Sequence, residues 1–284
     1  MNKKYFTPKK IHAYLRAAIQ LVFFLFLPSA FTTAFSGIKS VLTQIGAGNP
    51  IALSSFLTVL LALCAYTIVF GRFFCGYACA FGTLGDAVHS LYLFLCKKCK
   101  KKPLLLKKSW KKPLSYVKYA VLLAVVLLCF LGVYGDLTGW SPWDVFSMLR
   151  SGNFKVGAYW LGCILLVLIL VGMVFCERFF CRFLCPMGAV FSLLPILPFF
   201  SVRRKREKCA KGCTACEKVC PSDLSLPEDG SWNVSGDCFQ CQKCLEICPK
   251  KNAKSSIRNF RGNEIWFTLL RAVVLAAVLI LAGI

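Results

Sequence analysis

The chain has 284 residues, 57% of them hydrophobic, and its 35 Lys and Arg residues far outnumber its 12 Asp and Glu residues. High hydrophobicity with one-sided positive charge is typical of membrane proteins whose basic loops face one side of the bilayer. The basic residues lie between long apolar runs rather than on a soluble surface, which excludes nucleic acid as the expected partner. Most of the 18 cysteines fall in short-period motifs near Lys and Arg, which favours metal ligation over disulfides.

Five apolar stretches are each close to the ~20 residues that a helix needs to span a bilayer. The first is long and no small-residue cleavage site follows it, so we expect a spanning helix rather than a cleavable signal peptide. The predicted spans are Ala17–Phe35, Ile51–Phe70, Tyr116–Gly135, Ala158–Cys176 and Ile265–Gly283. The sequence therefore predicts a mostly α-helical, polytopic membrane protein.

Basic residues predict how these spans are oriented. They concentrate in the N-terminal tail, in the run Lys97–Lys112 and in Arg203–Arg206, whereas the loop expected after the first span holds only Lys39. All the basic segments then lie on one side if the N-terminus is cytoplasmic. We expect a protein of the bacterial cytoplasmic membrane, with its C-terminus outside.

Two further apolar features complete this picture. Residues Met187–Phe200 contain two prolines and are too short to span, so they are expected to form an interfacial or re-entrant segment. Arg271 lies inside the last predicted span near its cytoplasmic end, where its side chain is expected to snorkel to the lipid headgroups.

An internal repeat relates two halves of the chain. The sequence G-R-F-F-C-G-Y-A-C at Gly71–Cys79 follows the second predicted span, and E-R-F-F-C-R-F-L-C-P at Glu177–Pro186 follows the fourth. Because two spans precede each motif, both halves should have the same orientation, as a parallel repeat about an axis normal to the membrane. Both C-x-x-x-C pairs are therefore expected at the cytoplasmic membrane surface.

The strongest motif is a doubled cysteine run between Cys209 and Pro249. Its second part is C-x-x-C-x-x-C-x-x-x-C-P, the bacterial ferredoxin spacing, in which the fourth cysteine holds the other cluster. Its first part has one residue added after Cys209. One [4Fe–4S] cluster is predicted on Cys209, Cys213, Cys216 and Cys248, and a second on Cys238, Cys241, Cys244 and Cys220. A tetrathiolate zinc site is the alternative, which two consecutive C-P endings disfavour.

These motifs divide the chain into four parts. Residues 1–100 form the first membrane repeat, residues 101–200 the second with its interfacial segment, residues 201–262 a ferredoxin-like domain with two clusters, and residues 263–284 a final transmembrane helix.

The order of these parts resembles the NapH-type membrane polyferredoxins, which are related to the membrane part of NosR-like proteins. The resemblance covers most of the chain and rests on the ferredoxin doublet with C-R-F-L-C-P-M-G at Cys181–Gly188. It implies electron transfer between a quinone pool or cytoplasmic carriers and a partner redox protein, as a quinol dehydrogenase subunit or an electron-transfer component of an oxidoreductase. The chain departs from the family pattern at Ala80, where proline is usual, and has no flavin-attachment sequence.

The cysteines at the two repeats have several interpretations. They could bind a third metal centre together, form redox-active dithiol pairs, or pack as hydrophobic side chains. This candidate centre consists of Cys75, Cys79, Cys181 and Cys185. A rival set, Cys75, Cys79, Cys96 and Cys99, lies in one half and lacks a counterpart in the other.

Other cofactors receive less support from the sequence. Only two histidines are present, both near the expected cytoplasmic edge, so bis-histidine haem is not expected. Trp140 and Trp143, with Asp136 and Asp144, are expected at the outer interface as an aromatic belt. A quinol site there is an alternative, because an interfacial carboxylate could accept quinol protons.

The leading functional hypothesis is a membrane electron conduit. The alternatives are a redox or iron sensor, or a maturation factor, whose clusters signal, and a metal-handling protein. The basic cytoplasmic face suits membrane lipid and also a soluble acidic carrier such as a ferredoxin or flavodoxin. A membrane or extracytoplasmic redox subunit is the other expected partner.

Overall fold

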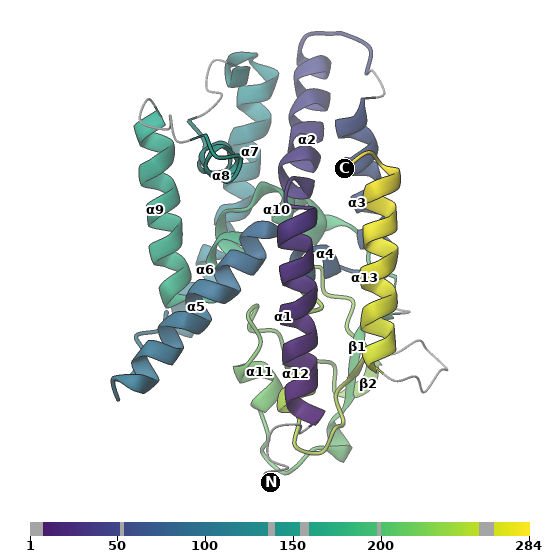
Figure 1. Ribbon diagram of the computed structural model, residues 1–284. Coiled ribbons are helices and arrows are strands. Elements are labelled where there is room, and N and C mark those ends of the chain that lie inside the picture. Colours follow the sequence, from purple (N-terminus) through teal and green to yellow (C-terminus); the bar gives the residue numbers. More distant parts are fainter. Residues whose placement is uncertain (1–7, 52–53, 136–139, 154–158, 198–199, 256–263) are drawn as a thin grey trace. The chain divides into compact units, whose positions relative to one another are not determined.

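The computed structural model describes residues 8–51, 54–135, 140–153, 159–197, 200–255 and 264–284, and these residues are mostly helical (Figure 1). The chain forms two compact units, each assembled from separate stretches of sequence. Unit 1 comprises residues 1–28, 63–79 and 191–281, and unit 2 comprises residues 29–62, 80–190 and 282–284. Each unit draws on both predicted membrane repeats, so the four predicted domain boundaries stay predictions.

Unit 1 combines long apolar helices with the cysteine-rich segment, which is the described part of the predicted ferredoxin-like domain (residues 201–255). Its helices α1 and α13 lie side by side, and both contact α4 (Figure 1). Three short strands pair antiparallel in the order β2-β1-β3. The elements wholly within this unit are α1 (Pro8–Phe26), α4 (Phe73–Tyr77), β1 (Val202–Lys205), η5 (Arg206–Lys208), α11 (Ala215–Lys218), β2 (Asp229–Trp232), α12 (Lys243–Ile247), β3 (Lys254–Ser255) and α13 (Glu264–Leu281).

The core of the cysteine-rich segment is small and apolar. Val202 from β1, Leu226, Leu245 from α12 and Ala253 are all buried, together with Cys216. So few apolar residues cannot by themselves stabilise a domain of this size, a situation in which metal ligation commonly contributes to folding.

Arg271 does not snorkel to the headgroups as expected, because protein groups surround it within unit 1. The residue is 1% exposed, and its guanidinium lies 5.0 Å from the ring centre of Phe73. It donates hydrogen bonds to the carbonyl oxygen of Phe200 at 3.4 Å and to the hydroxyl of Ser255 at 3.3 Å. Burial with these partners joins α13 to the cysteine-rich segment.

Unit 2 is built around aromatic side chains. Phe31 in α2 lies edge-on to Phe81 and Phe180, with ring centres 5.4 and 6.1 Å away. Contacts also link α2 with α7 and α9 with both α5 and α8. The elements wholly within this unit are α2 (Ala30–Gly46), α5 (Ala80–Lys98), α6 (Lys108–Leu114), α7 (Val117–Phe130), η1 (Val133–Gly135), α8 (Pro142–Arg150), α9 (Trp160–Phe175) and the π-helical turn η3 (Phe180–Leu184).

Two of the predicted spans correspond to helices long and apolar enough to cross a membrane, Lys108–Phe130 and Glu264–Leu281. Helices α3 (Ser55–Phe70) and α9 are apolar but have only 16 residues each. These two helices and α10 (Pro186–Leu193), at the start of the expected interfacial segment, complete the helices of the described chain.

The predicted first span, Ala17–Phe35, is wrong as one continuous helix. It is divided between α1 and α2, and would count as a third span only as a broken pair. Pro28 explains the division, because it lacks a backbone donor and disfavours helical geometry at the preceding residue. The segment around Lys39, expected to be a loop, is also helical and belongs to α2. The Lys39 ammonium lies 4.9 Å from the ring centre of Tyr134.

Candidate metal centres

The two halves of the ferredoxin-like segment share one loop geometry. Gly212 precedes Cys213 with a φ of 67°, and Gln240 precedes Cys241 with a φ of 53°. Both residues occupy the left-handed region, which glycine adopts readily and other residues adopt only under constraint. Each loop then enters a short helix, α11 or α12, that carries the third cysteine of its run.

The fourth cysteines also follow a common geometry. Asp223 and Lys251, each three residues after the fourth cysteine, have φ angles of 52° and 50°. Their backbone N–H groups donate to the carbonyl oxygens of Cys220 at 3.0 Å and Cys248 at 3.3 Å. The same tight turn thus follows each C-P pair, despite the residue added in the first run.

Five cysteines from the two runs line one cavity in unit 1. Cys238, Cys241 and Cys244 come from the second run, and Cys216 and Cys220 come from the first. Backbone and side chains of Phe239, Gln240 and Gln242 close the cavity around them. This lining includes all four cysteines predicted to hold the second cluster, together with Cys216 of the set predicted for the first. An all-thiol donor set suits iron–sulfur ligation.

Burial makes these thiols difficult to ionise without a metal. It raises the pKa of the Cys220 thiol to about 11 and that of Cys238 to about 12, with the neighbouring Cys241 sulfur adding to both shifts. Burial and the nearby sulfurs likewise raise the pKa of Cys244 well above its ordinary value. A bound cationic cluster would reverse this preference, because a coordinating thiol is deprotonated outright.

Two cysteines of the other predicted ligand set contact Asn252. Its backbone N–H donates to the sulfur of Cys248 at 3.2 Å, and its side-chain amide donates to the sulfur of Cys209, also at 3.2 Å. Arg204 donates to the sulfur of Cys216 at 3.0 Å. Such donors stabilise thiolates and tune the potential of a cluster that thiolates hold. The sequence motifs gave no indication of Asn252 or Arg204.

Among the residues described, no three Cys, His, Asp or Glu side chains gather closely enough to share a single metal ion. A cubane holds its thiolates at four corners, farther apart than the ligands of one ion. The assignment of the eight cysteines to two cubanes accordingly stays a prediction.

The first C-x-x-x-C turn packs against the second ferredoxin loop within unit 1. Arg72, which is 1% exposed, stacks 4.7 Å from the ring centre of Phe239 and lies 3.5 Å from a carboxylate oxygen of Asp237. Gly76, between Cys75 and Cys79, lies directly against the Phe239 carbonyl, and any side chain there would collide with it. The turn therefore abuts the loop that carries Cys238 and Cys241.

The second C-x-x-x-C turn repeats this local fold within unit 2. The Cys79 backbone N–H donates to the Phe74 carbonyl oxygen at 2.9 Å, and Cys185 donates to Phe180 at the same distance. Both cysteine pairs are buried. Because the pairs belong to different units, a centre shared by Cys75, Cys79, Cys181 and Cys185 stays a prediction. The rival set with Cys96 and Cys99 is also divided between the units.

Trp143 is not part of an aromatic belt as expected. It is buried in unit 2, where its indole N–H donates to the Tyr134 hydroxyl at 3.3 Å and its ring lies edge-on to Phe35 at 5.1 Å. Beside it is a cavity of about 230 Å³ whose polar lining includes Asp144 and Lys39. Asp136, the other carboxylate considered for a quinol site, lies outside the described residues.

Comparison with known proteins identifies the family. The family described as "4Fe-4S binding domain" matches residues 52–113 and 158–206, which include both C-x-x-x-C turns. The uncharacterized protein MJ0749 of Methanocaldococcus jannaschii is 32% identical over 70% of this chain and 69% of its own length. The ferredoxin-type protein NapH of Haemophilus influenzae is 26% identical over 70% of this chain and 67% of its own length. The chain belongs to the NapH-type ferredoxin family.

Membership of the NapH-type family makes this chain one of a family of iron–sulfur electron-transfer proteins. Another member, the putative electron transport protein YccM of Escherichia coli, is 28% identical over 67% of this chain and 52% of its own length. No solved structure matches the chain.

Proposed function

We propose that this protein is a membrane-bound electron conduit that carries two [4Fe–4S] clusters. It passes electrons between a quinone pool or a cytoplasmic carrier and a partner redox protein. The observation that carries this proposal is the cavity whose lining includes Cys220, Cys238, Cys241 and Cys244, since it joins thiols from two separate runs. A bound [4Fe–4S] cluster supplies one-electron redox chemistry, and the residues of the chain hold and insulate it.

The packing of Gly76 against the Phe239 carbonyl supports a route for electrons between the second predicted cluster and the membrane segment. It brings the turn of Cys75 and Cys79 against the loop of the second predicted cluster within unit 1. We propose that the further metal centre on both cysteine pairs would exchange electrons with the cluster on that loop. Cys75 and Cys79 would hold this centre beside the loop, and Cys181 and Cys185 would complete it.

The two long apolar helices support a membrane location. With the positive-inside rule, they favour the bacterial cytoplasmic membrane, a cytoplasmic N-terminus and ferredoxin-like domain, and an outside C-terminus. About five spans in two parallel repeats remain our proposal for the whole arrangement.

The cavity beside Trp143 supports a quinol branch of the proposal. Its lining supplies what a quinol headgroup requires, namely the aromatic rings of Phe35 and Trp143, the Lys39 ammonium and the Asp144 carboxylate. Asp144 would accept one of the two protons that quinol releases on oxidation, the other would pass to solvent, and the two electrons would pass singly to the clusters. The membership in an electron-transfer family does not favour the alternative of a sensor or maturation factor.

The test is quantification of iron and acid-labile sulfide, with electron paramagnetic resonance, on protein purified without oxygen. Two cubanes predict about eight irons and eight sulfides. Reduction by a quinol analogue in steady turnover, abolished by Asp144→Asn with full iron content, would support the quinol branch. Stoichiometric zinc with iron near zero would refute the proposal.

A further inference from the structure

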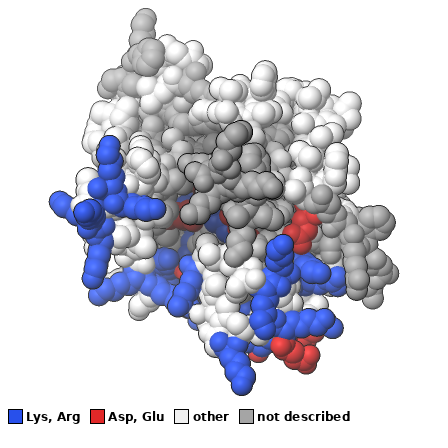
Figure 2. Space-filling view, turned by 60° about the horizontal axis from the view of Figure 1, so that its bottom comes forward, with Lys and Arg blue, Asp and Glu red and all other residues white. Residues whose placement is uncertain are grey.

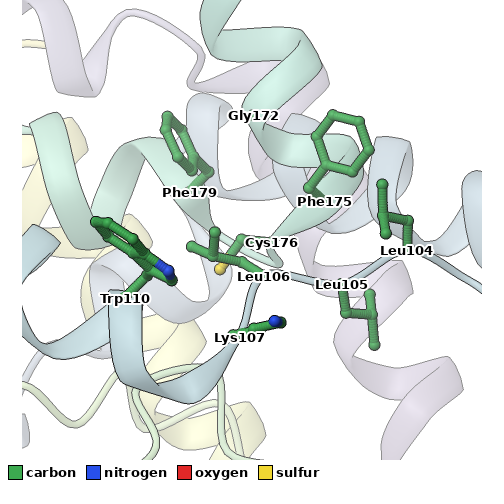
Figure 3. A pocket seen from close by; sticks show the side chains of 9 residues that line it. All are labelled: Leu104, Leu105, Leu106, Lys107, Trp110, Gly172, Phe175, Cys176 and Phe179. Atoms are coloured by element: carbon green, nitrogen blue, oxygen red, sulfur yellow. The ribbon is translucent and has the colours of Figure 1, made fainter.

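Unit 2 contains an apolar cavity that lies away from the cysteine runs. It has a volume of about 310 Å³, which falls in the range of small-molecule sites. In Figure 3, Trp110 and Phe179 lie on one side, Phe175 and Leu104 on the other, and Leu106 and Cys176 between them.

Hydrogen bonds hold the backbone that lines one side of the cavity. The extended stretch before α6 is held to α9 by a hydrogen bond from the Leu106 backbone N–H to the Phe175 carbonyl oxygen at 3.1 Å. The Leu104 backbone N–H donates to the Tyr92 hydroxyl at 2.8 Å. Gly172 allows the Phe179 ring to lie directly on the backbone of α9, since a side chain at this position would overlap the ring.

The rim of the cavity combines exposed apolar side chains with positive charge. Leu104 and Trp110 are 67% and 62% exposed, although each lines the cavity. Lys107 is the only charged residue among those that line it. The surrounding segment, residues 97–118, contains ten lysines and no acidic residue. An apolar cavity whose one charged lining residue is a lysine is complementary to an amphiphile with a hydrocarbon chain and a negative headgroup.

We propose that this cavity binds an anionic phospholipid, with part of an acyl chain against Phe175 and Phe179 and the phosphate headgroup at Lys107. The tryptophan at the rim suits this position, because indole rings favour the level of the headgroups. Basic clusters at the end of membrane helices are the usual partners of such lipids. The inference needs the membrane location of the proposed function but none of its cluster chemistry.

Quenching of Trp110 by brominated lipid tests the proposal. The full-length protein is placed in phosphatidylcholine nanodiscs that contain a minor fraction of either brominated phosphatidylglycerol or brominated phosphatidylcholine. The signal of Trp110 is the difference between the wild type and Trp110→Phe, since the chain has six tryptophans. We expect the anionic lipid to be preferred by about fivefold, the effect of one lysine at an anionic headgroup.

Two charge reversals decide whether the cavity is responsible. Lys107→Glu should abolish the preference, whereas Lys98→Glu, in the same basic run but outside the cavity lining, should retain most of it. Iron content and helical circular dichroism, measured on the same samples, establish that each variant is folded. Equal quenching by the two lipids, or an equal loss in both variants, would overturn the proposal. Normal iron content in that case would leave the proposed electron transfer intact.

Discussion

Arg178 and Asp86 form a buried, two-point ion pair within unit 2. The Arg178 Nε donates to Oδ1 of Asp86 at 3.0 Å and its Nη2 donates to Oδ2 at 2.5 Å, and the arginine side chain is fully buried. The arginine belongs to the second R-F-F-C motif, and Arg72 of the first motif pairs with Asp237 within unit 1. The repeated arginine therefore anchors each C-x-x-x-C turn to an acidic residue elsewhere in its own unit.

Removing one partner of the buried pair should destabilise unit 2. Asp86→Asn leaves the Arg178 charge buried without its counter-ion, which typically costs about 3–5 kcal/mol. We expect a lower midpoint of thermal unfolding and poorer recovery of folded protein from membranes. Glu207→Gln, at an exposed acid, is the matched control and should leave the midpoint unchanged. An Asp86→Asn midpoint equal to that of the control would contradict the assigned role.

Gly76→Ala should disturb the second predicted cluster without touching a cysteine. The added methyl group would collide with the Phe239 carbonyl and displace the loop between Cys238 and Cys241. We expect the iron content to fall by about four atoms per chain, the content of one cubane. Gly85→Ala is the control, since its new methyl group meets its nearest neighbour at 3.6 Å, an ordinary contact. Equal iron loss in the two variants would remove this explanation.

The fourth cysteine of each run should ligate the cluster that the other run holds. Cys220→Ser is expected to remove the paramagnetic signal of the cluster on the 238–244 loop, and Cys248→Ser that of the cluster on the 209–216 loop. The cavity shared by Cys220 and Cys238, and the contacts of Asn252 with Cys248 and Cys209, are the structural reasons. If each substitution instead removed the cluster of its own run, the predicted pairing would be wrong.

The protein stripped of iron should lose stability as pH rises above 9. Burial raises the pKa of Cys220 to about 11 and that of Cys238 to about 12, from an ordinary value of 9.0. The folded state thus holds these protons more tightly, so its stability is complete below pH 9 and declines as pH rises through the folded values. The loss between pH 9 and pH 10 should be about 1 kcal/mol for each thiol.

Denaturant unfolding at pH 8, 9 and 10 measures this loss. Protein loaded with iron and sulfide is the control, because metal-bound thiolates have no proton to release in that interval. A stripped protein as insensitive to pH as the loaded one would show that these thiols are not buried together.

The family could be predicted from the sequence, because the cysteine spacing and the repeated R-F-F-C motif are local patterns that ligand geometry imposes. It could not predict where the chain breaks or which charges are buried. Pro28 lies in the first apolar stretch, but the mean hydropathy of that stretch stays high despite one proline, so the break between α1 and α2 was not predicted. The burial of Arg271 depends on Phe200 and Ser255, and that of Arg72 on a residue 165 positions away, contacts that only the folded chain creates.

A basic surface on the cysteine-rich segment should bind an acidic electron carrier. Lys250, Lys251 and Lys254 directly follow the last cysteine and are exposed, and basic side chains far outnumber acidic ones on the face drawn in Figure 2. Ferredoxins and flavodoxins are usually acidic, so opposite charge should accelerate their encounter with this surface. Anionic lipid alone is the competing explanation for the charge.

The rate of cluster reduction by an acidic carrier separates these explanations. It should fall about tenfold or more as ionic strength rises from about 0.01 to 0.15 M, where the Debye length shortens from about 30 to 8 Å. Charge reversal of Lys250, Lys251 and Lys254 to Glu should slow reduction at low salt while iron content stays constant. Reversal of Lys97, Lys98 and Lys101, exposed in unit 2, changes the net charge equally and should have a smaller effect. Equal slowing in both triple variants would indicate net charge rather than a docking surface, and salt-independent reduction would favour quinol as the donor.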